Sequence, residues 1–71
     1  MATYCVNKNP QPNGDHEVHN LDLRCPHTPG VNSQVFLGTH LSCHGALMAA
    51  KQLYYPQSNG CYYCARPCHS R

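Results

Sequence analysis

The chain has 71 residues, with five Lys or Arg against three Asp or Glu, and a formal net charge of +2. This length limits residues 1–71 to one small domain and makes a purely apolar core marginal. The basic residues are scattered and no apolar run reaches membrane-spanning length, so neither a charge-driven nucleic-acid grip nor a membrane anchor is indicated.

A crosslink is expected instead, because the chain has six Cys, no Trp and one Phe. The first residues, Met1–Cys5, lack the basic and apolar regions of a secretory signal. We therefore expect a cytoplasmic monomer, in which thiols stay reduced and paired cysteines more often bind metal than form disulfides.

The first predicted element is a β-hairpin. Ala2–Asn7 is rich in β-forming residues, the turn-rich segment 9–15 contains the Asn13-Gly14 pair, and His16–Asn20 reads as the returning strand. Alternation along that second strand places Glu17 and His19 on one face of it.

A third strand and a helix follow an irregular, proline-containing segment over 21–34. Val35–Leu37 predicts a short strand that ends at Gly38. Ser42 is a suitable N-cap, and the apolar positions from Cys43 onward have helical spacing. Pro56 ends the helix, and residues 58–60 read as a turn.

The C-terminal segment carries the most chemistry. Gly60-Cys-Tyr-Tyr-Cys64 places two thiols on a turn, and Cys68-His69 follows. The predicted fold is thus α+β: a hairpin plus a third strand, one helix packed on the sheet, and a C-terminal Cys-rich turn.

Four side chains are the predicted ligands of one zinc ion. A structural zinc site needs four N or S ligands in a tetrahedron, and Cys61 and Cys64 supply one edge of it. His19 and Cys25, at the end of the hairpin and beyond it, are the best-spaced candidates for the opposite edge. This site would close the long excursion over 21–59.

Other assignments of the cysteines and histidines stay open. Cys68 or His69 could replace His19 as a ligand, and Cys25 could form a disulfide with Cys43 in an oxidising environment. An iron–sulfur cluster would instead use four thiols, those of Cys25, Cys61, Cys64 and Cys68. Cys5 and Cys43 are otherwise small buried apolar residues, and the remaining histidines are expected at the surface: His16, His27, His40 and His44.

The segment from His19 to Cys64 resembles the metal-binding domain of the bacterial DNA-methyl-phosphotriester repair protein Ada and its shorter relatives. The matching pieces are His19…Cys25, the strand 32–37, the Ser-capped stretch 42–47 and Gly60–Cys64. The resemblance covers about two-thirds of the chain and implies an Ada-like zinc-binding architecture. In that repair protein the first ligand is a methyl-accepting Cys, whereas His19 stands here, so alkyl transfer is not implied.

The whole chain also resembles small bacterial Cys/His-rich proteins that carry three short motifs. These motifs appear here as Tyr4–Asn7, Asn13–His19 and Gly60–His69. This second resemblance implies no activity.

The sequence favours a small zinc-stabilised module that binds a nucleic-acid or protein partner. A possible binding patch combines aromatic and basic residues near the Cys-rich turn. Its members are Tyr54, Tyr55, Tyr62, Tyr63, Lys51 and Arg66.

The alternative function is thiol redox or metal transfer through the Cys61/Cys64 pair. Hydrolysis is rejected, because the three acidic residues, Asp15, Glu17 and Asp22, all lie in one eight-residue stretch and form no catalytic set. We therefore expect no enzyme activity.

Overall fold

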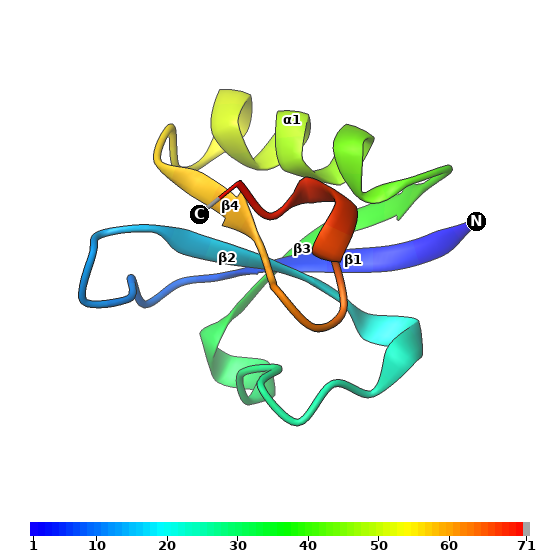
Figure 1. Ribbon diagram of the computed structural model, residues 1–71, viewed down its shortest axis with the longest axis horizontal. Coiled ribbons are helices and arrows are strands. Elements are labelled where there is room, and N and C mark those ends of the chain that lie inside the picture. Colours follow the sequence, from blue (N-terminus) through cyan, green and yellow to red (C-terminus); the bar gives the residue numbers. More distant parts are fainter. Residues whose placement is uncertain (71) are drawn as a thin grey trace.

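A four-stranded sheet with the strand order β3-β1-β2-β4 forms the centre of the molecule (Figure 1). The computed structural model describes residues 1–70. The strands are β1 (Ala2–Asn7), β2 (His16–Asn20), β3 (Gln34–His40) and β4 (Ser58–Gly60). Helix α1 (Cys43–Leu53) packs on the sheet, which confirms the predicted α+β fold class.

The predicted hairpin of β1 and β2 is confirmed, with an antiparallel register that pairs Cys5 with His19 and Val6 with Val18. Gly14 in the connecting turn has a φ of +91°, a conformation that glycine adopts without strain. The backbone N–H of Asp15 donates to the Asn13 side chain at 2.9 Å. The turn residues thus determine where the chain reverses.

Strand β3 is longer than the sequence predicted, because it continues through Gly38 to His40 rather than ending at Gly38. Gly38 has a φ of +85°, and the register between β3 and β1 shifts at this point. The glycine thus accommodates a β-bulge instead of ending the strand.

Strand β4 is a correction to the sequence analysis, which assigned residues 58–60 to a turn. These three residues pair in parallel with β2, and all three are buried. The N–H of Cys61 donates to Val18 O at 2.9 Å and the N–H of His16 donates to Gln57 O at 2.9 Å. Long-range pairing therefore prevails over turn-forming composition here.

Helix α1 begins and ends close to the predicted positions. Ser42 Oγ accepts from the His44 N–H at 3.3 Å, which supplies the expected N-cap. The buried face of the helix is Cys43, Ala46 and Ala50. These small side chains let the helix lie close to the sheet.

The apolar core between helix and sheet is thin. It contains Tyr4, Val6 and Val18 from the strands, together with small Ala and Cys side chains, whereas Phe36 is 65% exposed. Two of the largest fully buried side chains, His19 and Asp15, are polar. A core of this composition agrees with the expectation that a crosslink or metal supplements it.

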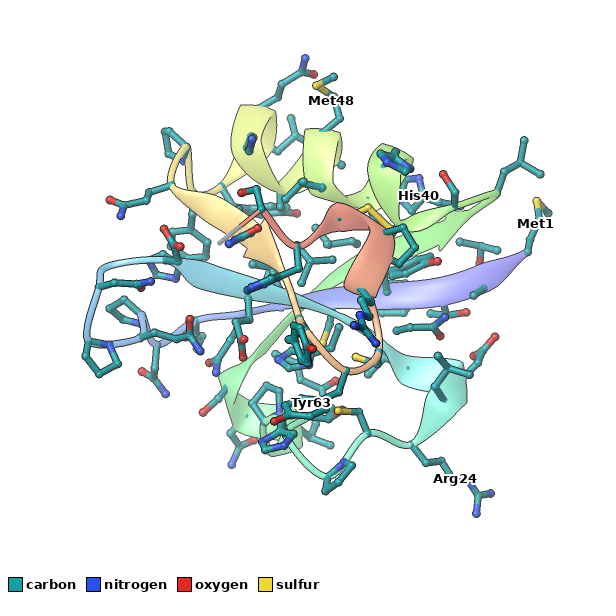
Figure 2. All side chains as sticks on the ribbon, viewed as in Figure 1. Met1, Arg24, His40, Met48 and Tyr63 are labelled. Carbon is teal, nitrogen blue, oxygen red and sulfur yellow. A yellow bond between two sulfur atoms is a disulfide. The ribbon has the colours of Figure 1, made fainter. Side chains whose placement is uncertain are left out.

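The irregular segments lie around this frame. Two short 3-10 helices, Leu21–Leu23 and Val31–Ser33, belong to the connection from β2 to β3, which lies on the side of the sheet away from α1 (Figure 1). A third, Arg66–Cys68, returns toward α1. There the Cys43 and Cys68 sulfurs form a disulfide, drawn as a yellow bond in Figure 2.

Within residues 1–70, no helix has the length and apolar character needed to span a bilayer.

Candidate metal centre

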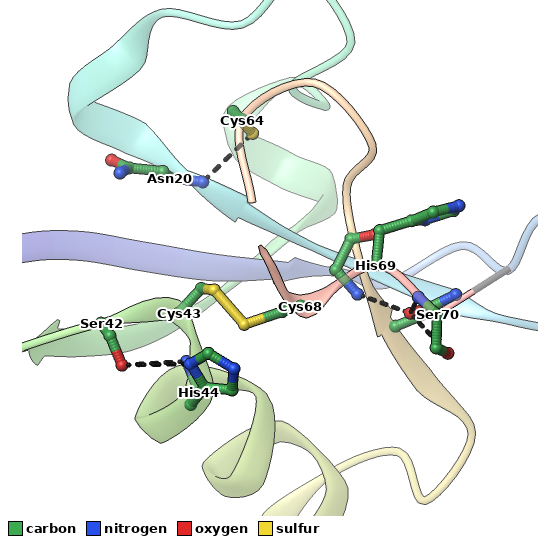
Figure 3. Close-up of a disulfide and its surroundings, with 10 residues drawn as sticks. Asn20, Ser42, Cys43, His44, Cys64, Cys68, His69 and Ser70 are labelled. Carbon is green, nitrogen blue, oxygen red and sulfur yellow. Dashed lines mark hydrogen bonds between the residues drawn. A yellow bond between two sulfur atoms is a disulfide. The ribbon is translucent and has the colours of Figure 1, made fainter. Parts of the chain in front are cut away.

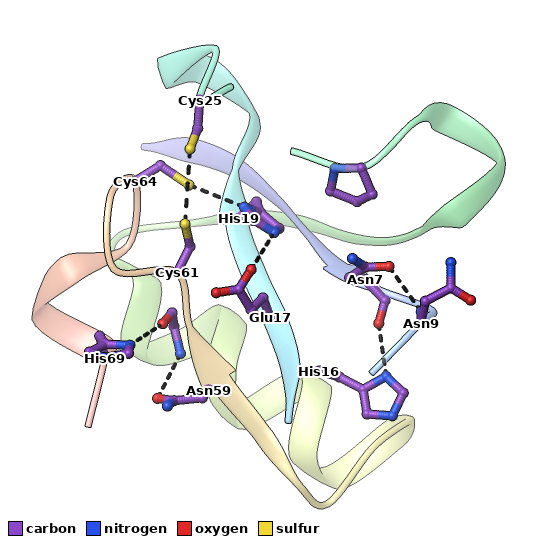
Figure 4. A network of polar contacts seen from close by, with 12 residues as sticks. Asn7, Asn9, His16, Glu17, His19, Cys25, Asn59, Cys61, Cys64 and His69 are labelled. Carbon is purple, nitrogen blue, oxygen red and sulfur yellow. Dashed lines mark hydrogen bonds and ion pairs between the residues drawn. The ribbon is translucent and has the colours of Figure 1, made fainter. Parts of the chain in front are cut away.

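Three thiols and one imidazole meet beside the ends of β2 and β4 (Figure 4). One ligand atom from each side chain lies within 4.8 Å of the corresponding atoms of the other three, and all four residues are buried. The cluster consists of His19, Cys25, Cys61 and Cys64. The structure thus brings together the four residues that the sequence analysis selected as ligands, in an arrangement that can hold a metal ion.

The distances within the cluster resemble the edges of a zinc tetrahedron. Cys25 Sγ lies 3.9 Å from Cys61 Sγ, and Cys64 Sγ lies 3.5 Å from His19 Nδ1. Zinc–sulfur bonds of 2.3 Å give a sulfur–sulfur edge of about 3.8 Å, and a mixed sulfur–nitrogen edge is slightly shorter. A disulfide would need a separation of about 2.05 Å, so the spacing fits a shared metal better than an S–S bond.

Each ligand comes from a separate part of the frame. His19 projects from β2 on the face opposite to Val18, and its cross-strand neighbour is Cys5. Cys25 follows Arg24, whose left-handed backbone (φ +51°) redirects the chain after the first 3-10 helix. Cys61 and Cys64 occupy the turn after β4, which the Ala65 N–H closes by donating to Cys61 O at 3.0 Å.

His19 presents a different nitrogen to each side of the cluster. Nδ1 is the atom near Cys64, while Nε2 is buried, has no hydrogen-bond partner and lies 3.5 Å from Glu17 Oε1. Burial lowers the pKa of His19 to about 4, with a smaller contribution from His27, so the ring is neutral at pH 7 and able to ligate.

The contact between Glu17 and His19 is typical of the outer shell of zinc sites. A metal-bound histidine commonly donates its second N–H to a carboxylate, which fixes the tautomer and orients the ring. Metal binding at Nδ1 would leave the proton on Nε2, facing Glu17. The buried Nε2 without a partner is therefore accounted for once a metal binds.

A backbone amide points at one of the sulfurs. The Asn20 N–H donates to Cys64 Sγ at 3.3 Å, and the backbone of Cys64 and of Tyr63 acts to lower the pKa of Cys61. Burial nevertheless raises the pKa of Cys61 and of Cys64, and the amides only oppose that rise. Thiolates at neutral pH thus need a further positive charge, which a bound cation would supply.

The two alternative ligands lie elsewhere. Cys68 is bonded to Cys43 with an S–S distance of 2.02 Å, and His69 Nδ1 contacts Gly60 O at 3.0 Å. The disulfide considered between Cys25 and Cys43 is therefore wrong. An iron–sulfur cluster with Cys68 as a ligand does not fit this structure either, because the Cys68 sulfur is bonded to Cys43.

Cys5 and Cys43 are both buried, as predicted, but they differ in chemistry. Cys5 is a free thiol, whereas Cys43 belongs to a disulfide that the sequence analysis did not anticipate. Its partner was missed because the first turn of the helix and the C-terminal segment meet only through the tertiary fold.

The aromatic residues of the predicted binding patch form two separate sets of contacts. Tyr55 stacks on His16, with ring centroids 3.7 Å apart, beyond the end of α1. Tyr62 and Tyr63 contact each other at 5.2 Å, and Tyr63 also stacks on His27 at 4.4 Å. Figure 2 shows Tyr63 on the side of the sheet opposite to the helix.

The basic residues of the patch follow the same division. The Arg66 guanidinium lies 4.7 Å from the centre of the Tyr62 ring. Lys51 lies in the last turn of α1, and Tyr54 follows that helix. The exposed aromatic-basic surface beside the metal cluster is therefore His27, Tyr62, Tyr63 and Arg66, which we call the Cys-turn surface.

Two contributors to the site were missed from sequence. Glu17 was placed on the same face as His19 but was given no role, although the two-residue spacing was the available signal. Gly60 was treated as a turn residue. An added Cβ there would lie 2.7 Å from Ala65 O and 2.8 Å from two backbone or side-chain atoms of Cys68, so only glycine permits this close approach.

Fold and site together define a small α+β domain with a buried Cys₃His cluster that can hold a metal ion. Comparison with protein-family models, with curated proteins and with solved structures finds no match for this chain.

Proposed function

We propose that this protein is a zinc-stabilised binding module in which one Zn²⁺ joins the hairpin to the C-terminal turn. The observation that carries this proposal is the convergence of four buried N and S ligand atoms within 4.8 Å. Four protein ligands leave no open coordination position, which is the arrangement of structural rather than catalytic zinc. Sulfur ligands favour zinc over magnesium or calcium.

The ligand order supports an Ada-like architecture as part of the proposal. An imidazole at position 19 is followed by Cys25 and then by the C-x-x-C pair, which is the order that the resemblance implies. Because the first ligand is His19 and not a thiolate, the role proposed is structural. Zinc bound to a neutral imidazole and three thiolates would leave the chain with a net charge of about +1.

Metal content and fold are the first test. Native mass spectrometry should find one zinc per chain, and a strong chelator should remove it with loss of tertiary structure by near-UV circular dichroism. Cys61→Ser should abolish stoichiometric zinc, whereas the matched control Cys5→Ser, at a buried thiol outside the cluster, should retain it. A metal-free protein that stays well ordered would refute the proposal.

The partner proposed for the Cys-turn surface is single-stranded nucleic acid. Tyr62 and Tyr63 are 44% and 65% exposed, and both lie between the ligands Cys61 and Cys64, so zinc would hold their backbone fixed. Bases stack on such rings at a gain of about 1–3 kcal/mol each, and Arg66 adds a cation beside Tyr62. Because the net charge is small, stacking must supply most of the affinity.

Titration with fluorescent single-stranded oligonucleotides tests this partner. We expect weak binding with a shallow dependence on salt, since few phosphates are neutralised. Tyr63→Ala should weaken binding about 10-fold, and the matched control Tyr54→Ala, an exposed tyrosine at the end of α1, should not. Absence of binding at low salt would exclude nucleic acid and leave a protein as the candidate for this surface.

Thiol chemistry at Cys61 and Cys64, the alternative from sequence, has less support. Both thiols are buried, and burial raises both pKa values, which disfavours a nucleophilic thiolate at neutral pH.

A further inference from the structure

A second group of possible ligands surrounds the disulfide at the start of α1 (Figure 3). The sulfurs of Cys43 and Cys68 and one ring nitrogen of His44 lie within 4.8 Å of one another. Both cysteines are buried, while His44 is exposed. The group therefore combines a protected sulfur pair with an imidazole that reaches solvent.

The backbone holds these three residues in place independently of the S–S bond. Cys43 and His44 open the first turn of α1, which Ser42 caps through the His44 N–H. Cys68 is the last residue of a 3-10 helix, and its backbone N–H donates to Ala65 O at 2.9 Å. Gly60 lets this turn lie directly on β4. Cleavage of the disulfide would thus leave both sulfurs near their present positions.

A pocket of about 420 Å³ opens beside this group. Cys43 and His44 line it, together with Tyr4, Asn20 and Cys64 among others, so the pocket also reaches a ligand of the first cluster. The pocket gives a small reductant a route to the disulfide and leaves room for a solvent molecule or a transferred ligand next to a bound ion.

We propose that reduction of the Cys43–Cys68 disulfide creates a second, open metal site for a thiophilic cation such as Zn²⁺. A dithiol supplies two electrons and two protons, is itself oxidised to a disulfide, and leaves two thiols on the protein. Zn²⁺ then displaces both thiol protons and binds Cys43 Sγ, Cys68 Sγ and the His44 ring. Once the S–S bond is broken, the two sulfurs must separate to about 3.8 Å, the edge of a zinc tetrahedron.

The two metal sites would differ in kind. The first would have four protein ligands and no open position. The second would have three protein ligands and one open position, beside the pocket that Cys43 and His44 line. Three protein ligands with one exchangeable position are typical of zinc that contacts a further ligand. The second site would therefore respond to redox conditions and exchange its metal, and it does not depend on the proposed partner.

Counting zinc in both redox states tests the proposal. The protein is reduced with dithiothreitol, desalted without oxygen, supplied with Zn²⁺ and examined by native mass spectrometry. We expect one more zinc on the reduced chain than on the oxidised chain. Near-UV circular dichroism of the same samples reports whether the fold survives reduction.

Variants assign the additional zinc. Cys43→Ala/Cys68→Ala should hold the same number of zinc ions before and after reduction. His44→Ala should weaken the additional zinc by at least about 10-fold in competition with a chromophoric chelator, because even an outer-shell partner is worth that much. The matched control His27→Ala, another exposed histidine, should not weaken it.

Two results would overturn the proposal. One is a reduced chain that gains no zinc, whether it stays folded or unfolds, because the site requires Cys68 to remain against α1. The other is a gain that persists in the Cys43→Ala/Cys68→Ala variant. The zinc count of the oxidised chain keeps the outcomes separate, since it reports on the first site alone, whereas the difference between the two redox states reports on the second site.

Discussion

The two ends of segment 61–68 are fastened by different sulfur chemistry. Cys61 and Cys64, at its start, converge with His19 and Cys25 at sulfur spacings suited to a metal. Cys68, at its end, is covalently bonded to the first turn of α1. One short segment thus meets both the hairpin and the helix, and with a metal bound each joint would respond to a different agent, a chelator in one case and a reductant in the other.

The comparison teaches how a thin core can suffice. The disulfide closes a stretch of 25 residues and so reduces the entropy of the unfolded state. A metal held by the other four residues would do the same, and neither crosslink requires large apolar side chains. The arrangement also predicts which changes affect both joints, which affect one, and which affect neither.

Gly60→Ala should have the largest effect, because it acts on both joints. The added methyl would lie 2.7 Å from Ala65 O and 2.8 Å from Cys68, which are backbone-level contacts that cannot relax by a rotamer change. We expect a loss of about 3 kcal/mol in the free energy of unfolding, measured by urea denaturation. Gly30→Ala is the matched control, since an added Cβ there has no neighbour within 4 Å. Equal stability of the two variants would show that segment 61–68 does not pack closely against Gly60 in β4.

Removal of the disulfide should affect only the helix joint. The bond spans 25 residues, and the loop-entropy model assigns it about 3.5 kcal/mol. We expect Cys43→Ala/Cys68→Ala to lose stability of this order while it retains one zinc in the first site. Each single Ala variant should lose about as much as the double variant, because one cysteine alone forms no bond. Loss of that zinc in the double variant would mean that the two joints are not independent.

Glu17→Gln should weaken only the metal joint. The carboxylate lies 3.5 Å from His19 Nε2, and loss of such an outer-shell partner typically lowers metal affinity about 10–100-fold. Competition with a chromophoric chelator measures this change directly. Asp22→Asn removes an equal charge from the nearby 3-10 helix and serves as the control. An unchanged affinity in Glu17→Gln would assign the contact to packing alone.

Cys5, the cross-strand neighbour of His19, should report on the burial of the sheet through its own titration. Burial raises the pKa of this thiol from its ordinary value of 9.0 to about 11. The unfolded chain therefore loses this proton first, and the stability due to Cys5 is complete below pH 9 and falls as the pH rises toward 11. Relative to the Cys5→Ala variant, the free energy of unfolding of the protein should fall by about 1.4 kcal/mol between neutral pH and pH 10, measured by urea denaturation. A pH-independent difference between the two proteins would contradict the burial of this thiol.

Local signals explain why much of the fold could be predicted. The Asn13-Gly14 turn determined the hairpin, and Ser42 with the following small apolar residues determined α1. The extension of β3 was missed, because Gly38 accommodates a bulge that its sequence does not distinguish from an ending. Strand β4 was missed because Ser-Asn-Gly forms a strand here only through pairing with β2.

The site divides in the same way. The C-x-x-C spacing and the position of His19 at the end of a strand were enough to select four residues that the structure brings together. Their occupation by zinc stays a prediction. The Cys43–Cys68 bond could not be foreseen, because no sequence spacing relates a helix start to a C-terminal turn.

Residues 26–33 are mostly exposed, with Val31 81% accessible, and they follow Cys25 directly. Proteolytic nicking there would divide the chain into a fragment that contains His19 and Cys25 and a fragment that contains the other two ligands. Because Cys43 and Cys68 both lie in the second fragment, no covalent bond would bridge the cut. Cohesion of the two fragments would then depend on the packing of α1 on the sheet, on the pairing of β1 with β3 and of β2 with β4, and on any cation held by the four ligands.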